Sequence, residues 1–72
     1  MGNAGSTRAT FLRAIERRNL FVAEATAREL GRLPLADALE LVILMAEKHD
    51  RRADRAAVKW LRRLFEERRR DS

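Results

Sequence analysis

One hydrophobic block, residues 35–46 (LADALELVILMA), constrains this chain more than any other stretch. Ten of its twelve residues are apolar, and Asp37 and Glu40 are the exceptions. The block is too short to span a bilayer as a helix, which takes about 20 apolar residues. As a helix, its apolar arc covers roughly 220° of the surface, against about 100° for an ordinary surface helix. We therefore expect a central core helix that the other segments wrap.

Two shorter amphipathic segments precede this block. Residues 8–18 are expected to form one helix, with Thr7 as its N-cap. Its inner face consists of Phe11, Leu12 and Ile15. Asn19 interrupts the pattern and can cap a second helix over residues 20–30. Gly31 follows at the position where a left-handed residue commonly ends a helix.

The second half of the chain predicts two more helices. Pro34 suits the first position of the central helix, which should run to about residue 48. Asp50 is a good N-cap for a last helix, from 51 to about 69. The predicted inner face of this last helix consists of Ala53, Ala57, Trp60, Leu61, Leu64 and Phe65, with Val58 at its edge.

The chain length of 72 residues allows one small domain. There is no cysteine, hence no disulfide framework, so stability must come from helix packing, self-association or a partner. Strand signals such as β-branched alternation are missing. We predict an all-α, compact four-helix domain over residues 7–70, with a central hydrophobic third helix. Residues 1–6 are expected to be a disordered tail.

The charge balance favours anionic partners. Sixteen basic residues face eleven acidic ones, which gives a net charge of +5. Nucleic acid, acidic protein surfaces and lipid headgroups are the partner classes that such a balance suits. The alternative is that arginine-rich composition reflects base composition of the genome and a solvated surface. The N-terminus lacks the apolar stretch of a signal peptide, so we expect a cytoplasmic protein.

Side chains for chemistry are scarce. The single histidine, His49, falls at the end of the central helix, where a cation interacts well with the helix dipole. With no Cys or Tyr, no nucleophile, base and orienting group can be assembled. One histidine and no EF-hand spacing argue against a metal site. We expect no enzyme activity, no cofactor, no metal and no small-molecule substrate.

A basic arc on the last helix is the strongest functional signal. It lies opposite the predicted inner face and could follow phosphates through non-specific, salt-dependent contacts. A protein partner or plain solvation would explain it as well. Membrane binding is disfavoured, because the apolar face of this helix is expected in the core. The basic arc consists of Arg51, Arg52, Arg55, Lys59, Arg62, Arg63, Arg69 and Arg70.

Two features point to a protein partner or a second copy of the chain. Leu44 falls inside the narrow polar strip of the central helix, and an apolar residue in such a strip can contact a partner. The carboxylates of this acidic strip are Asp37, Glu40 and Glu47. Phe21 projects on the polar side of its helix. It either packs across the corner between the first two helices or stays exposed as a contact.

Residues 27–31 share some features with a helix-turn-helix motif. The Ala-x-x-x-Gly step and the helix that follows resemble the turn of DNA-binding motifs. The second helix of such a motif must offer polar side chains to base edges, and this one offers Leu, Val, Ile and Met. A plain pair of antiparallel helices is the favoured interpretation.

Three runs carry a resemblance over about residues 9–67. They read FLRAIERRN, ATARELGRLPLADALELVILMAE and RAAVKWLRRLFEE. The chain resembles small uncharacterised all-helical proteins of actinobacteria. The resemblance implies an all-α fold in a bacterial cytoplasm, and it carries no catalytic or binding residues.

The sequence therefore predicts a non-enzymatic, small helical protein-interaction module, with self-association as one form of that function. The partner would be a protein or another copy of the chain. The alternative is a nucleic-acid-binding protein that uses the basic arc of its last helix.

Overall fold

Four helices in chain order make up the protein. The computed structural model describes the backbone of residues 3–71 and the side chains of residues 7–70. The helices are α1 (Asn3–Glu16), α2 (Leu20–Leu30), α3 (Leu35–Glu47) and α4 (Ala53–Asp71). No strand occurs within residues 3–71. The all-α, four-helix prediction is confirmed.

The first helix begins earlier than predicted. Because α1 starts at Asn3, Thr7 lies within the helix and is not its N-cap. Residues 3–6 were expected in a disordered tail and belong to α1, whereas residues 1 and 2 lie outside the described part of the chain. The helix ends at Glu16, and in the turn that follows Arg18 has a left-handed φ of 60°. There the N–H of Asn19 donates to the Ala14 carbonyl at 2.8 Å, so the last turn closes on itself.

The second helix has the predicted bounds and caps. The side chain of Asn19 accepts a hydrogen bond from the N–H of Val22 at 3.2 Å, as an N-cap residue does. At the other end, Gly31 has φ 80° and donates its N–H to the Ala27 carbonyl. A glycine adopts this backbone conformation without the steric cost that a Cβ brings.

The central helix begins one residue later and ends one residue earlier than predicted. Pro34 is the N-cap of α3, and Asp37 lies in the first turn, where the helix dipole favours an acid. After Glu47 the chain turns at His49, a second non-glycine residue with positive φ, at 57°. The N–H of Asp50 then donates to the Met45 carbonyl at 2.9 Å. Helices α1 and α3 thus end in the same hydrogen-bonded closure.

The last helix begins two residues later than predicted. The Asp50 carboxylate accepts the backbone N–H of Arg52 at 2.8 Å, and the Asp50 carbonyl accepts the N–H of Ala53 at 3.0 Å. Asp50 therefore organises a turn that leads into α4, rather than capping the helix directly.

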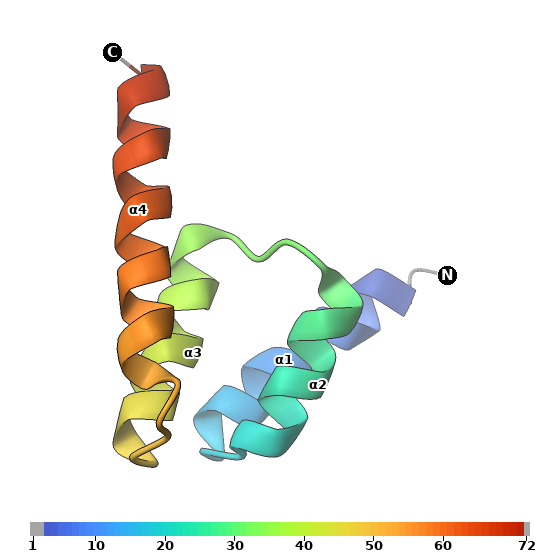
Figure 1. Ribbon diagram of the computed structural model, residues 1–72. Coiled ribbons are helices and arrows are strands. Elements are labelled where there is room, and N and C mark those ends of the chain that lie inside the picture. Colours follow the sequence, from blue (N-terminus) through green and yellow to red (C-terminus); the bar gives the residue numbers. More distant parts are fainter. Residues whose placement is uncertain (1–2, 72) are drawn as a thin grey trace.

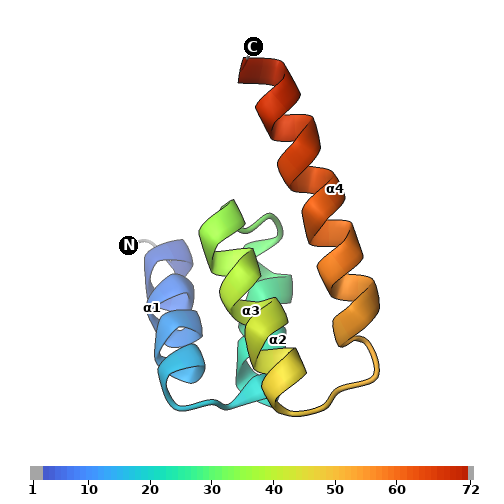
Figure 2. The same cartoon turned by 90° about the vertical axis from the view of Figure 1, so that its left-hand side faces the viewer.

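The third helix is central, as predicted. Helix α3 contacts each of the other three helices, whereas α4, within the described residues, packs against α3 and no other helix (Figure 1). The domain is flat, at 35 × 34 × 16 Å, and the C-terminal part of α4 projects well beyond the other helices (Figure 2). The buried cluster consists of Phe11, Ala14, Ile15, Ala23, Leu33 and Leu44.

Candidate interaction surface

Leu44 belongs to the core, so its assignment as a partner contact is wrong. Its side chain is 0% exposed and packs in the buried cluster together with Phe11 and Ile15. The helical wheel placed it among carboxylates, and it lies there in the structure too. The wheel could not show that α1 covers this side of α3.

Two ion pairs join α1 to the acidic strip of α3. Arg8 donates through Nε and Nη2 to one oxygen of Asp37, at 3.2 and 3.0 Å, and Arg18 Nε lies 3.2 Å from Glu47. The partners are 29 residues apart in both pairs. Because the sequence separation is the same in both pairs, α1 and α3 run parallel with a constant register. Leu44, at the same offset from Ile15, lies between the two pairs.

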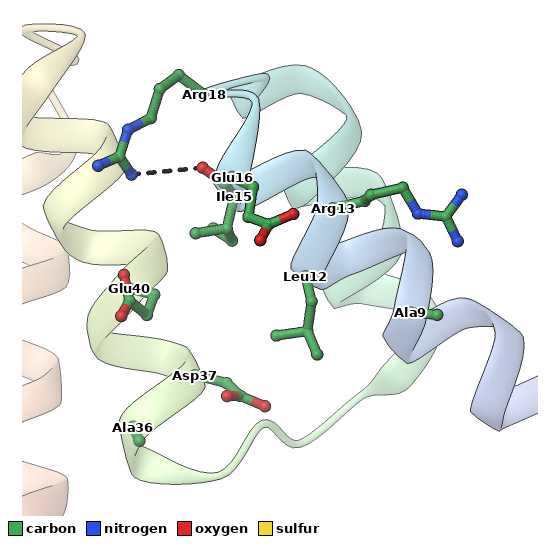
Figure 3. A pocket seen from close by; sticks show the side chains of 9 residues that line it. All are labelled: Ala9, Leu12, Arg13, Ile15, Glu16, Arg18, Ala36, Asp37 and Glu40. Carbon is green, nitrogen blue, oxygen red and sulfur yellow. Dashed lines mark hydrogen bonds between the residues drawn. The ribbon is translucent and has the colours of Figure 1, made fainter.

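In these pairs, two of the three carboxylates of the acidic strip bind arginines of the same chain. Asp37 is 8% exposed, and its assignment to a partner surface is wrong. Glu47 remains half exposed but faces Arg18. Glu40 alone of the three is both exposed and without a role in these two pairs. It lines a groove with Asp37, across from Leu12 and Glu16 of α1 (Figure 3).

Phe21 is an exposed aromatic side chain. It is 83% exposed, so the interpretation in which it packs across the corner of α1 and α2 is wrong. Its neighbours Leu20 and Val22 pack against the core and so turn the residue between them outward. Phe21 remains available as a contact for a partner.

The basic arc divides into two groups. Arg52 lies 2.7 Å from Glu24 and 2.8 Å from Asp50, and Arg63 lies 2.9 Å from Glu67, which Arg32 also approaches at 3.2 Å. Arg52 thus links the turn before α4 to α2, whereas the pair of Arg63 with Glu67 lies within α4. The remaining members are exposed: Arg51, Arg55, Lys59, Arg62, Arg69 and Arg70.

The ion pairs also lower the pKa values of the acids that take part. Hydrogen bonds from the Arg52 side chain and backbone lower the pKa of Asp50 to about 2. The Arg63 side chain, with help from Arg32, lowers the pKa of Glu67. Asp50 and Glu24 in turn raise the pKa of Arg52. Both acids are thus charged throughout the neutral range, as structural partners are.

Trp60 sets the rotation of α4 about its own axis. Its Nε1–H donates to the backbone carbonyl of Leu35 at 2.8 Å. The side of α4 that includes Trp60 then faces α3, and its half-buried residues are Ala53, Ala56, Ala57, Trp60, Arg63, Leu64 and Glu67. No side chain of α4 from residue 53 to 70 is fully buried.

An apolar stripe on α4 is left in solvent. Val58, Leu61 and Phe65 are 51%, 46% and 61% exposed. Leu61 and Phe65 were predicted on the inner face, so that assignment is wrong. The sequence offered one signal that was missed: the apolar arc of α4 is wider than a single neighbouring helix can cover.

The C-terminal part of α4 extends past its neighbour. Trp60 bonds to Leu35, the first residue of α3, so residues 61–71 continue beyond that helix. Eleven helical residues span about 16 Å. The ion pair between Arg32 and Glu67 ties this projecting segment to the α2–α3 connection. Phe65 lies on it, which accounts for its high exposure.

A groove between α2 and α4 is a second concave surface. Its floor is apolar and comes from α3, and its α4 side is lined by basic side chains. The floor consists of Ala38, Leu41, Val42 and Met45, and the α4 side includes Lys59 and Arg63. Because Arg63 is already paired with Glu67, Lys59 supplies the more accessible charge there.

Neither a metal site nor a membrane span emerges from the part of the chain that is described. No three His, Cys, Asp or Glu side chains gather there in a way that could hold a metal ion. None of its helices combines the length and apolarity needed to cross a bilayer. Comparison of the chain with protein-family models, curated proteins and solved structures gave no match.

Proposed function

We propose that this chain is a non-enzymatic helical protein-interaction module that self-associates through the apolar stripe of α4. The observation that carries the proposal is the exposure of Val58, Leu61 and Phe65 on one side of a 19-residue helix. Small proteins seldom leave aligned large apolar side chains in water unless these contact something.

The spacing of the stripe suits a partner helix. Its residues follow one another at intervals of three and four, which is the pattern of a helix–helix seam. Ala57 and Leu64 flank the seam and are half-buried. A second helix laid along this side would cover the stripe and the edges of both flanking residues.

The small size of the core favours association along this seam. Only seven apolar side chains are buried among the described residues, and none of them is in α4. A domain of this size buries only about 60% of its unfolded surface. Covering α4 from its open side would extend the core in the direction where it is thinnest.

The expected affinity is modest. Fully burying a large apolar side chain is worth about 1.5–3 kcal/mol, so each half-exposed member of the stripe contributes about 1 kcal/mol. Two copies together would gain about 6 kcal/mol from the stripe, before the flanking contacts are added. Association costs at least about 4 kcal/mol, so the stripe alone leaves about 2 kcal/mol. A dissociation constant between about 10 µM and 1 mM, which is the range we expect, needs about 2–5 kcal/mol more from the flanking contacts.

Sedimentation velocity over a series from about 10 µM to 2 mM tests this proposal. The mass should rise from monomer to dimer, and Leu61→Glu with Phe65→Glu should hold the chain monomeric. Phe21→Glu is the matched control, because it removes an exposed aromatic outside α4. A wild-type chain that stays monomeric throughout the series would overturn the proposal. So would a dimer that Phe21→Glu breaks and the stripe variant does not.

Nucleic-acid binding is the second candidate, and one observation favours it. Arg55, Lys59 and Arg62 are all exposed, and the first and last of them lie about two helical turns apart along α4. Three phosphate contacts would weaken duplex binding about 500-fold for a tenfold rise in salt. Fluorescence anisotropy with duplex DNA at two salt concentrations measures this. Arg55→Glu with Arg62→Glu should abolish binding, and undetectable binding at low salt would exclude this function.

A further inference from the structure

Opposite charges mark the two ends of the apolar stripe. Asp54 lies seven residues before Leu61, and Arg68 lies seven residues after it. Seven residues are close to two helical turns, so both charged residues lie in line with the stripe. Both are exposed. The stripe therefore runs from an acidic end to a basic end, with Leu61 at its centre.

We propose that two copies pair their α4 helices in antiparallel orientation, about a two-fold axis that passes beside Leu61. This inference rests on the proposed self-association and specifies its geometry. Asp54 of each copy then lies opposite the partner's Arg68, and this contact occurs twice in the dimer. The symmetry is that of the commonest dimers, in which both copies use the same patch.

The apolar contacts agree with this arrangement. With Leu61 at the centre, Ala57 lies opposite the partner's Phe65, and Val58 lies opposite the partner's Leu64. The large ring of Phe65 thus meets the smallest side chain beside the seam, as close packing requires. Both members of each pair are exposed or half-buried in the single chain, so they have surface left to bury.

The projecting end of α4 also gains a neighbour. Residues 61–71 extend beyond α3, and in the antiparallel pair they would lie along the first half of the partner's α4. A parallel pair would instead set Asp54 beside the partner's Asp54, and Arg68 beside the partner's Arg68. Like charges at both ends disfavour that orientation.

Charge reversal tests the orientation on the full-length chain. In the antiparallel dimer, Asp54→Arg alone places like charges at both symmetric contacts, and Arg68→Asp alone does the same. We expect each single variant to raise the dissociation constant about tenfold. The double variant, Asp54→Arg with Arg68→Asp, should return it to near the wild-type value. Because the double variant carries the same change at the start of α4, its recovery excludes an effect of Asp54→Arg on the helix alone.

Mixing distinguishes the two orientations directly. Wild type and the double variant, each with a different fluorophore, should sort into separate homodimers if the helices are antiparallel, because mixed pairs bring like charges together. Parallel helices would instead favour the mixed dimer, and energy transfer between the fluorophores would rise. The equimolar mixture of the two single variants should associate about as well as wild type.

The outcomes separate this inference from the function on which it rests. A chain that never dimerises overturns both. The antiparallel arrangement alone is overturned if Leu61→Glu breaks the wild-type dimer but charge reversal leaves its dissociation constant unchanged. Mixed dimers between wild type and the double variant would overturn it too. Arg17→Asp reverses an exposed charge outside α4, and it should leave the dissociation constant unchanged.

Discussion

Replacing Leu44 by alanine tests the packing on which the fold depends. Leu44 is 0% exposed and lies among buried residues of α1, α2 and the α2–α3 connection. Truncating a fully buried leucine costs about 2–5 kcal/mol, and the upper part of this range applies where the cavity cannot collapse. Leu44 is held between two helices that ion pairs join at both ends, so we expect a loss of about 3 kcal/mol.

This loss is large relative to the whole stability. Chains of this length have free energies of unfolding of about 4–11 kcal/mol. A loss of 3 kcal/mol lowers the melting temperature of a small domain by about 12–24 °C. Leu44→Ala should therefore keep about 1–8 kcal/mol, enough to stay folded in the absence of urea.

Leu61→Ala is the matched control, because it removes the same atoms from a side chain that is 46% exposed. In dilute monomer it should cost less than about 1 kcal/mol. Urea unfolding at about 5 µM, followed by circular dichroism at 222 nm and by Trp60 fluorescence, gives both free energies. Equal costs for the two variants, or a cost under 1 kcal/mol for Leu44→Ala, would contradict the burial of Leu44. The earlier interpretation of Leu44 as a partner contact would then regain support.

Three further predictions concern the ends of the helices. His49→Gly should stabilise the chain by about 0.5–1 kcal/mol in urea unfolding, because His49 holds a left-handed φ of 57° that glycine adopts without strain. A loss of stability would show that a contact of the imidazole outweighs this backbone strain. Asn19→Ala should cost about 1 kcal/mol through loss of the α2 N-cap, and Asn19→Gly a few tenths of that, whereas equal costs would deny the capping role. The pKa of Asp50 is lowered to about 2, so its contribution to stability is present above about pH 4 and is lost as the pH falls to about 2. The urea midpoint of wild type should thus fall more steeply than that of Asp50→Asn across this interval, and parallel curves would refute the pairing with Arg52.

Local signals predicted α2 completely. The cap at Asn19 and the stop at Gly31 depend on a side chain and a backbone position that interact within four residues. Such interactions can be inferred from spacing alone. The same logic missed the ends of α1 and α3, because Arg18 and His49 adopt left-handed conformations that are typical of glycine or asparagine.

The surfaces were harder to predict, because they depend on which helix is adjacent. Leu44 was assigned to a polar strip from its neighbours on the wheel. The strip is polar because it faces Arg8 and Arg18, which are equally spaced on another helix. That equal spacing of arginines and carboxylates is visible in the sequence. It shows that α1 covers this side of α3, and that the arginines pair with the carboxylates, only once α1 and α3 are known to run parallel.

The rotation of α4 was the other step that the sequence left open. Its apolar residues span an arc that α3 can cover from either side. The hydrogen bond from Trp60 to Leu35 selects one side, and Leu61 and Phe65 are then turned out. A tryptophan donor can reach any carbonyl that packing brings near it, so no sequence pattern indicates this partner.

Because α4 packs against α3 alone, the rest of its surface carries both an apolar stripe and a set of basic side chains. The apolar stripe and the exposed members of the basic arc share no residue, and the two surfaces adjoin where Val58 lies near Arg55 and Arg62. An antiparallel pair uses the stripe and the charges at its ends, and it leaves Arg55 and Arg62 in water. Self-association would then hold two basic arcs on one particle, and avidity can raise affinity for a long anionic partner well above that of one arc. The two functions are therefore compatible on this helix, because they use separate residues.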